Sequence, residues 1–205
     1  MDWMGIAFTV SVWTLPVLLA VTFHEAAHGW VAWRLGDETA YRLGRVTFNP
    51  LRHIDSFGTV LLPGLMLMAS GGTMMFGYAK PVPVNFAGLR RPRRDMVLVA
   101  LAGPGSNLLL ALLAAASIHL LTFLSGDVYQ WVGLNLVNAV RINLLLCVFN
   151  MLPIPPLDGG RVAVGLLPGA LGRRLARLER LGMVIILAGV FILPWIGGKI
   201  GLDLN

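Results

Sequence analysis

Charged residues are scarce in this sequence: Asp, Glu, Lys and Arg make up 13% of its 205 residues, whereas 57% are hydrophobic. An average soluble domain contains roughly 25% charged residues. The composition therefore excludes an ordinary soluble domain and indicates a membrane protein. The length fits one integral-membrane domain over residues 1–205 and leaves no room for a separate soluble module.

Cysteine is almost absent as well. Because Cys147 is the only one, an internal disulfide and a cysteine-rich zinc site are both excluded. Any bound metal must use His, Asp or Glu. The formal charge of +6 would suggest nucleic acid in a soluble chain, but basic residues in a membrane chain first report orientation. We therefore expect a lipid bilayer as the environment and no nucleic-acid partner.

Long charge-free runs predict an all-α polytopic fold with about four transmembrane helices. The first run has no basic region before it and no small-residue cleavage site after it, so we interpret it as a retained helix and not a signal peptide. All but Arg141 and Lys199 of the 16 Lys and Arg fall in three clusters, which favours placing those clusters in the cytoplasm and both termini outside. The expected helices cover about residues 3–23, 94–124, 130–153 and 179–198.

Residues 56–79 lie between two basic clusters assigned to the same side, so they must enter and leave the membrane on one face. Pro63-Gly64 and Gly71-Gly72 divide this stretch into pieces too short to span, which predicts a re-entrant segment. The alternative is one ordinary kinked span. The glycines of residues 56–79, which are Gly64, Gly71, Gly72 and Gly77, have two interpretations: this stretch is a gate for water and substrate, or the glycines only permit close packing.

Two short segments flank the expected re-entrant stretch. Residues 41–48 alternate apolar residues with polar residues or glycine, and residues 80–86 are interrupted by proline. These patterns predict short β-strands at the membrane boundary.

The strongest chemical signal is the pattern H-E-x-x-H at residues 24–28, at the inner end of the first expected helix. Positions i and i+4 share one helix face, so His24 and His28 can bind one metal ion while Glu25 reaches a water on that ion. Neutral imidazoles suit Zn2+, and we expect one zinc ion as the cofactor. Ionisable groups inside an apolar helix are costly in a bilayer, which favours a functional role.

A catalytic zinc ion needs three protein ligands and one open position, so a third ligand must come from elsewhere in the chain. His119 and Asp127 fall near the outer end of their helices, far from the His pair. Asp158 follows the returning helix at the depth of the His pair and is the best third ligand. The candidates inside or beside apolar segments are His53, Asp55, His119, Asp127 and Asp158.

Further motifs give the sequence a family resemblance. Residues 150–160 read N-x-x-P-x-x-P-x-D-G-G, residues 102–107 read A-G-P-x-x-N, and residues 49–55 read N-P-x-x-H-I-D. With H-E-x-x-H, this set resembles the site-2 protease family of intramembrane zinc metalloproteases, in a short form without PDZ-like or CBS-like modules. The matching motifs reach from residue 24 to residue 161.

The resemblance implies roles for individual residues. His24, His28 and Asp158 would bind zinc, Glu25 would be the general base, and Asn150 would position substrate or stabilise the oxyanion. His53 is less clearly assigned: it either binds substrate at the cytoplasmic mouth or is an interfacial histidine beside Asp55.

The resemblance also implies the reaction and its setting. The enzyme would hydrolyse peptide bonds within or near transmembrane segments of membrane-protein substrates, as in regulated intramembrane proteolysis. It would be a multi-pass protein of a prokaryotic inner membrane with its active site toward the cytoplasmic side. A substrate helix must unwind before attack, and an exposed strand edge would receive it by β-augmentation.

Three other functions compete with a protease. A zinc transporter would also place His and Asp inside helices, but it has no use for Glu25 and usually shows internal repeats. A zinc hydrolase of lipid or prenylated substrates would share H-E-x-x-H and the membrane. A scaffold without activity is disfavoured because every expected catalytic residue is present. The oligomeric state and the identity of the substrate are not indicated by the sequence.

Overall fold

The computed structural model describes residues 3–69 and 79–179 and, beyond these, only residues 181, 182, 184, 186, 188, 189 and 192. Within them, three helices are long and apolar enough to cross a membrane. Their positions agree with the first three expected helices, which confirms the all-α membrane architecture. They are α1 (Trp3–Arg34), α4 (Pro92–Ile118), which continues into the 3-10 helix η4 (His119–Phe123), and α5 (Gly126–Asn150).

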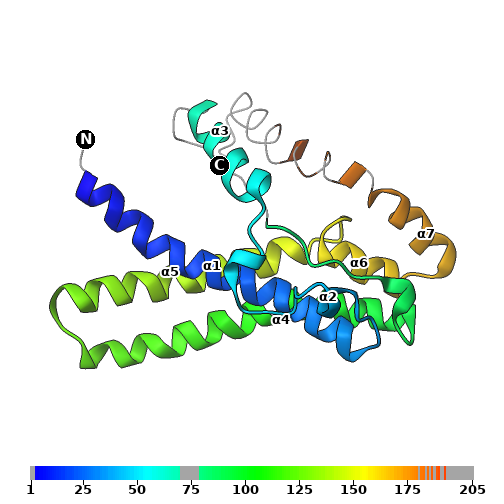
Figure 1. Ribbon diagram of the computed structural model, residues 1–205, viewed down its shortest axis with the longest axis horizontal. Helices are drawn as coiled ribbons and strands as arrows, with labels where there is room; N and C mark the ends of the chain where they lie inside the picture. The colour runs from blue at the N-terminus through cyan, green and yellow to red at the C-terminus, as the bar shows by residue number, and fades with distance from the viewer. Residues whose placement is uncertain are drawn as a thin grey trace.

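The three long helices pack on one another, and α4 and α5 form a hairpin (Figure 1). Small side chains line the contacts, among them Ala20 in α1 and Ala100 and Ala111 in α4, all nearly inaccessible. Small residues allow the close backbone approach on which helix association in lipid depends. Large side chains such as Leu109 and Leu145 instead lie exposed on the outer faces, as expected of surfaces that meet lipid.

Two short helices follow α5. The helix α6 (Asp158–Leu166) packs on α4, and α7 (Gly169–Arg177) packs on α6. Neither was expected from the sequence. Because the guanidinium of Arg93 in α4 donates to the carbonyls of Gly165 and Leu167, this pair of helices is fixed at the end of the bundle where α4 begins.

The short elements between α1 and α4 differ from the expectation of strands. The described residues contain no β-strand: residues 39–42 form a helical turn, Gly44 adopts a φ of 63°, and residues 79–85 are extended without a strand partner. The prediction of strands at 41–48 and 80–86 is therefore wrong for this structure. Pro81 and Pro83 lack an N–H group, and the N–H groups of Val82 and Asn85 donate to carboxylates instead.

The expected re-entrant stretch is described only as far as residue 69. Its first part is helical, and wide π-helical turns give way to α-helix just before Pro63, a residue that cannot donate a helical hydrogen bond. Figure 1 shows α3 directed away from the three long helices.

Residues 70–78 and most of the fourth expected helix, 179–198, lie outside the described residues. The short elements here are α2 (Thr39–Arg42), η1 (Pro50–Arg52), η2 (Ser56–Leu61), α3 (Leu62–Ala69) and η3 (Phe86–Gly88).

Candidate metal centre

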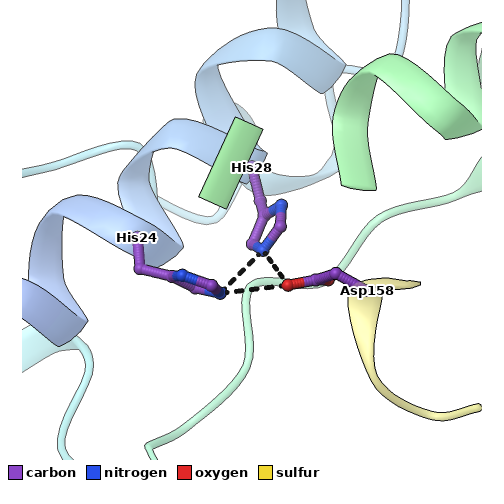
Figure 2. Close-up of side chains that lie close together, drawn as sticks. All are labelled: His24, His28 and Asp158. Carbon is purple, nitrogen blue, oxygen red and sulfur yellow. Dashed lines mark hydrogen bonds and ion pairs between the residues drawn. The ribbon is translucent and has the colours of Figure 1, made fainter. Parts of the chain in front are cut away.

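Three buried side chains from distant parts of the sequence converge at one point. His24 and His28 lie on one face of α1, and Asp158 is the first residue of α6. The two histidine Nε2 atoms are 3.0 Å apart, and Oδ2 of Asp158 lies 3.2 Å from Nε2 of His24 and 3.3 Å from Nε2 of His28. Figure 2 shows the three atoms facing one another. This cluster could hold a metal ion.

The other nitrogen of each imidazole is tied to an oxygen of α4. Nδ1 of His24 lies 2.6 Å from Oδ1 of Asn107, and Nδ1 of His28 lies 2.7 Å from the carbonyl oxygen of Val99. These oxygens only accept, so each Nδ1 donates its proton outward and leaves the lone pair on Nε2 directed inward. The Asn107 amide is oriented by its own donor, which binds the carbonyl of Ala20 and Oδ1 of Asn143.

The inward-facing atoms fit a cation. With both histidines in this tautomer, two nitrogen lone pairs and a carboxylate oxygen face each other without a proton between them. Among the described residues, Oδ2 of Asp158 is a buried oxygen that accepts no hydrogen bond. Tetrahedral ligands bound at about 2.1 Å lie about 3.4 Å apart, close to the separations observed. Two imidazoles and a carboxylate are a common donor set for a catalytic zinc ion.

Asp158 carries its charge in this setting. Burial alone would raise the pKa of its carboxyl. When protons lie between Oδ2 and the facing imidazoles of His24 and His28, their hydrogen bonds and positive charge outweigh burial and hold that pKa well below its usual range. A bound cation would take the place of those protons. The side chain is therefore a carboxylate, the form that a metal ligand requires.

Residues on one face of α4 contact both histidines of the candidate metal centre. Val99, Gly103 and Asn107 are spaced by four residues and therefore lie on one face of the helix. The first and last of them bind the histidines. Gly103 lies between, where a Cβ atom would come within 2.3 Å of Nε2 of His28 and 2.6 Å of Cε1 of His24. The imidazoles therefore rest directly on the backbone of α4, which only glycine permits.

The turn that delivers Asp158 is equally tight. Residues 151–157 fold back over the start of α6, and a Cβ atom on Gly159 would lie 2.2 Å from the carbonyl oxygen of Met151. A Cβ atom on Gly160 would lie 2.3 Å from the nitrogen of Pro155. The glycines after Asp158 thus let the turn press against the helix that carries the carboxylate.

A cavity of about 430 Å³ opens beside the three ligands. Glu25 lines it, and Oε2 of Glu25 accepts a hydrogen bond of 2.7 Å from the N–H of Val82. Asn150 lines it as well, with its amide donating to the carbonyl of Leu146. The cavity therefore brings the H-E-x-x-H glutamate and the asparagine of the N-x-x-P motif to the same space as the candidate metal ligands. Residues of the extended segment 79–85, together with Phe86 of η3, form one wall.

The remaining sequence candidates lie elsewhere. His53 is buried in a loop, where its Nε2 lies 3.0 Å from the carbonyl oxygen of Thr47, and it does not line this cavity. Asn49 caps η1 and Asp55 caps η2, so the N-P-x-x-H-I-D motif shapes the loop after α2. His119 is exposed in η4, at the α4–α5 hairpin.

Sequence reasoning missed the buried polar residues that support the ligands. Asn107 was noted only as the last residue of the A-G-P-x-x-N motif, without a role of its own, and Asn143 was not noted at all. A usable signal was present, because an amide side chain inside an apolar helix is costly in lipid unless it is hydrogen-bonded. Which partner each amide would find depends on the packing of α1, α4 and α5.

Comparison with known sequences agrees with this geometry. The chain matches peptidase family M50 over residues 12–132 and 119–193. It is 36% identical over 188 residues to YwhC of Bacillus subtilis, a candidate zinc metalloprotease by name, with 88% of this chain and 80% of that protein covered. It is 33% identical over 181 residues to the Mycobacterium tuberculosis protein Rip2, named in the same way, with 88% of this chain and 66% of that protein covered.

A third relative is the archaeal protein MJ0611 of Methanocaldococcus jannaschii, also a candidate zinc metalloprotease by name, which is 33% identical over 141 residues, or 68% of this chain and 62% of that protein. No solved structure matches the chain. The family match extends over most of the chain and includes both histidines and the aspartate that face one another in the structure. The chain therefore belongs to peptidase family M50, the site-2 protease family whose motifs its sequence resembles.

Proposed function

We propose that this protein is an intramembrane zinc metalloprotease that hydrolyses peptide bonds within or near the transmembrane segments of other membrane proteins. The observation that carries the proposal is the convergence of His24, His28 and Asp158, with the Nδ1 protons of both histidines held by outward acceptors. The family match and the zinc metalloprotease names of the relatives agree with it. Both histidines and Asp158 are the proposed zinc ligands, and one ion is expected.

Zinc, when bound, supplies a Lewis acid that polarises a peptide carbonyl and makes water acidic. Glu25 is the proposed general base: it takes the proton of the attacking water and passes it to the leaving amine. Its placement supports this role, because it lines the cavity beside the ligands and the N–H of Val82 holds one carboxylate oxygen. Among the described residues no hydrogen bond to the second oxygen is formed, which leaves it for water.

The cavity wall formed by residues 79–85 is suited to an extended substrate. These residues are extended and lack a strand partner among the described residues, so backbone groups of a substrate could pair with them by β-augmentation. A helical substrate must lose its own hydrogen bonds to do so. Asn150 is the proposed donor to the carbonyl that is attacked, and its position on the cavity wall supports this role, because only one of its amide hydrogens is used by the carbonyl of Leu146 in the described residues.

Glu25→Gln tests the proposal. Glutamine keeps the shape and can still accept from Val82, but it cannot take a proton from water. We expect cleavage of single-span helical peptides to fall by at least about 100-fold, as loss of a general base does, while zinc content measured by mass spectrometry stays at one ion per chain. Glu38→Gln makes the same chemical change at an exposed surface position and should leave cleavage unchanged.

Each alternative function gives a different result. Transport or scaffolding would survive the loss of Glu25, and a lipid hydrolase would leave every peptide of the panel intact. The panel should include peptides with and without helix-breaking residues at the cut site and a zinc chelator as a further control. Equal cleavage of both peptide sets, or cleavage that resists the chelator, would contradict an intramembrane zinc protease.

A further inference from the structure

A second cavity, of about 480 Å³, lies beside the cavity of the metal centre, and Pro81 is the only described residue that lines both. It is formed by the loop after α2 and by the start of the extended segment that forms a wall of the metal cavity. Among its described lining residues three are cations and none is an acid. The lining residues are Leu43, Arg45, Leu51, Arg52, Ile54, Lys80, Pro81 and Pro83.

Arg45 carries a buried charge, and no described residue supplies a counter-charge. Its side chain is 8% exposed, and its terminal nitrogens donate to the carbonyl oxygens of Arg52, Lys80 and Pro81. Carbonyl groups accept hydrogen bonds but bring no negative charge. In the described part of the chain no carboxylate forms an ion pair with Arg45, and its Nε atom has no partner. A buried cation in this state is costly unless an anion joins it.

The other two cations of the cavity, Arg52 and Lys80, also favour the binding of an anion. Arg52 and Lys80 are exposed and also form no ion pair within residues 3–69 and 79–179. The three positive charges around this cavity repel one another. A small anion bound between them would attract all three and offset that repulsion. A phosphate group offers several acceptor oxygens to guanidinium and ammonium donors at once.

The rim of the cavity is apolar. Leu43 is 59% exposed and Leu51 is 72% exposed. The cavity also lies near the membrane boundary, because Val46 and Val82 pack against Gly29 in the last turns of the membrane helix α1. Cations within a hollow and exposed leucines at its edge match the two ends of a phospholipid: a charged headgroup and the start of its acyl chains.

We propose that this cavity binds the phosphate headgroup of an anionic phospholipid, with Arg45, Arg52 and Lys80 as its ligands and Leu43 and Leu51 against the acyl chains. The site is separate from the metal centre and does not depend on the protease assignment. It is connected to that centre through the backbone, because the carbonyl of Lys80 binds Arg45 while the N–H of Val82, two residues on, binds Glu25.

The test measures lipid retained by the purified protein. Wild-type protein in detergent is equilibrated with phosphatidylglycerol or with phosphatidylcholine, and bound lipid is counted by native mass spectrometry. The double variant Arg52→Gln with Lys80→Gln removes two exposed charges of the cavity. The control, Arg94→Gln with Arg174→Gln, removes two exposed charges of α4 and α7 that lie outside it.

We expect wild type and the control to retain one phosphatidylglycerol that phosphatidylcholine does not replace, and the cavity variant to bind it at least roughly tenfold more weakly. Equal retention by the cavity variant and the control would overturn the proposal. A parallel arm adds inorganic phosphate and follows thermal unfolding. If phosphate stabilises wild type but not the cavity variant, and no phosphatidylglycerol is retained, the lipid assignment is overturned in favour of a soluble phosphate.

Discussion

The protonation of the candidate zinc ligands is set by residues that do not face the metal. Oδ1 of Asn107 holds the Nδ1 proton of His24, and this asparagine is completely buried between α1 and α5. The carbonyl of Val99 does the same for His28. Because only one tautomer leaves both Nε2 lone pairs inward, these two contacts decide whether the pair can bind a metal at all.

Asn107→Ala should therefore weaken zinc binding. Without Oδ1, nothing in α4 fixes the tautomer or the ring orientation of His24, and loss of such a partner typically costs 10- to 100-fold in metal affinity. Competition with a chromophoric chelator measures this affinity directly. Asn138→Ala is the matched control, because Asn138 is also buried in the bundle but donates to the carbonyl of Val12. A similar loss in both variants would show that the effect is general destabilisation.

Gly103 provides a second test at the residue scale. In Gly103→Ala the new Cβ atom would lie 2.3 Å from Nε2 of His28, so the imidazole or the helix must move. We expect the purified variant to contain little zinc and to show no detectable cleavage. Gly105→Ala is the control: no atom lies within 4 Å of its added Cβ, and zinc content should remain at the wild-type level. Normal zinc content in Gly103→Ala would refute the close packing of α1 on α4.

The convergence of His24, His28 and Asp158 was expected from the sequence, but the residues that hold their side chains in place were not. The spacing of H-E-x-x-H places His24 and His28 on one helix face. Counting residues along the expected helices places Asp158 at the same depth in the membrane as these two histidines. Asn107 and Asn143 meet only because α4 and α5 pack in a particular register. No local pattern specifies that register.

At the scale of elements, the segment of residues 82–90 is attached to α1 and the loop after it by three contacts. The N–H of Val82 donates to Glu25, the N–H of Asn85 donates to Asp37, and the N–H of Arg90 donates to the carbonyl of Leu35. The proline-interrupted pattern of residues 80–86 suggested a strand here, because the sequences of extended segments look alike whether a neighbouring strand or side chains accept hydrogen bonds from their N–H groups. The structure uses side chains, which leaves one edge of the segment facing the metal cavity.

Asp37→Ala should loosen this segment. Asp37 is buried and accepts hydrogen bonds from Asn85 and from both the N–H and the hydroxyl of Thr39, so its loss leaves several donors without an acceptor. We expect a loss of about 3 kcal/mol in the free energy of unfolding and faster proteolytic nicking within residues 82–90. Glu38→Gln removes only an exposed ion pair with Arg42 and should change stability by less than about 1 kcal/mol. Unchanged nicking in Asp37→Ala would contradict the role of this contact.

The long helices were predictable because uninterrupted apolar runs have few other solutions in a bilayer. Residues 94–124 and 130–153 were expected, and α4 with η4 and α5 occupy nearly the same ranges. The short helices α6 and α7 were not expected. Each has only nine residues, and most of their stability must come from packing on α4 and on each other.

At the scale of the whole molecule, members of all three basic clusters lie at one end of the bundle. The N–H of Arg90 binds the carbonyl of Leu35, next to Arg34, and Arg93 binds carbonyls at the end of α6. Arg93 and Arg173 line one cavity together. The sequence analysis predicted such an arrangement, because it assigned all three basic clusters to the same side of the membrane.

Cysteine labelling tests that orientation. In a Cys147→Ala background, single cysteines at residues 94 and 174 should react with a membrane-impermeant reagent only after the cells are permeabilised, because the reagent then reaches the cytoplasmic side of the membrane. A cysteine at residue 125, beside the α4–α5 hairpin, should react from outside in intact cells. Labelling of residues 94 and 174 from opposite sides would refute the shared orientation of the basic clusters. Labelling of residue 94 from outside would refute the re-entrant interpretation of residues 56–79 and favour a true span.

The distribution of the metal ligands along the chain has a consequence for biosynthesis. His24 and His28 leave the ribosome early, in the first membrane helix, whereas Asp158 follows about 130 residues later. At translation rates of 5–20 residues per second, the donor set stays incomplete for roughly ten seconds, and the supporting Asn107 also arrives in that interval. Under the proposed function, a nascent chain would therefore stay inactive toward neighbouring membrane helices until Asp158 has been made.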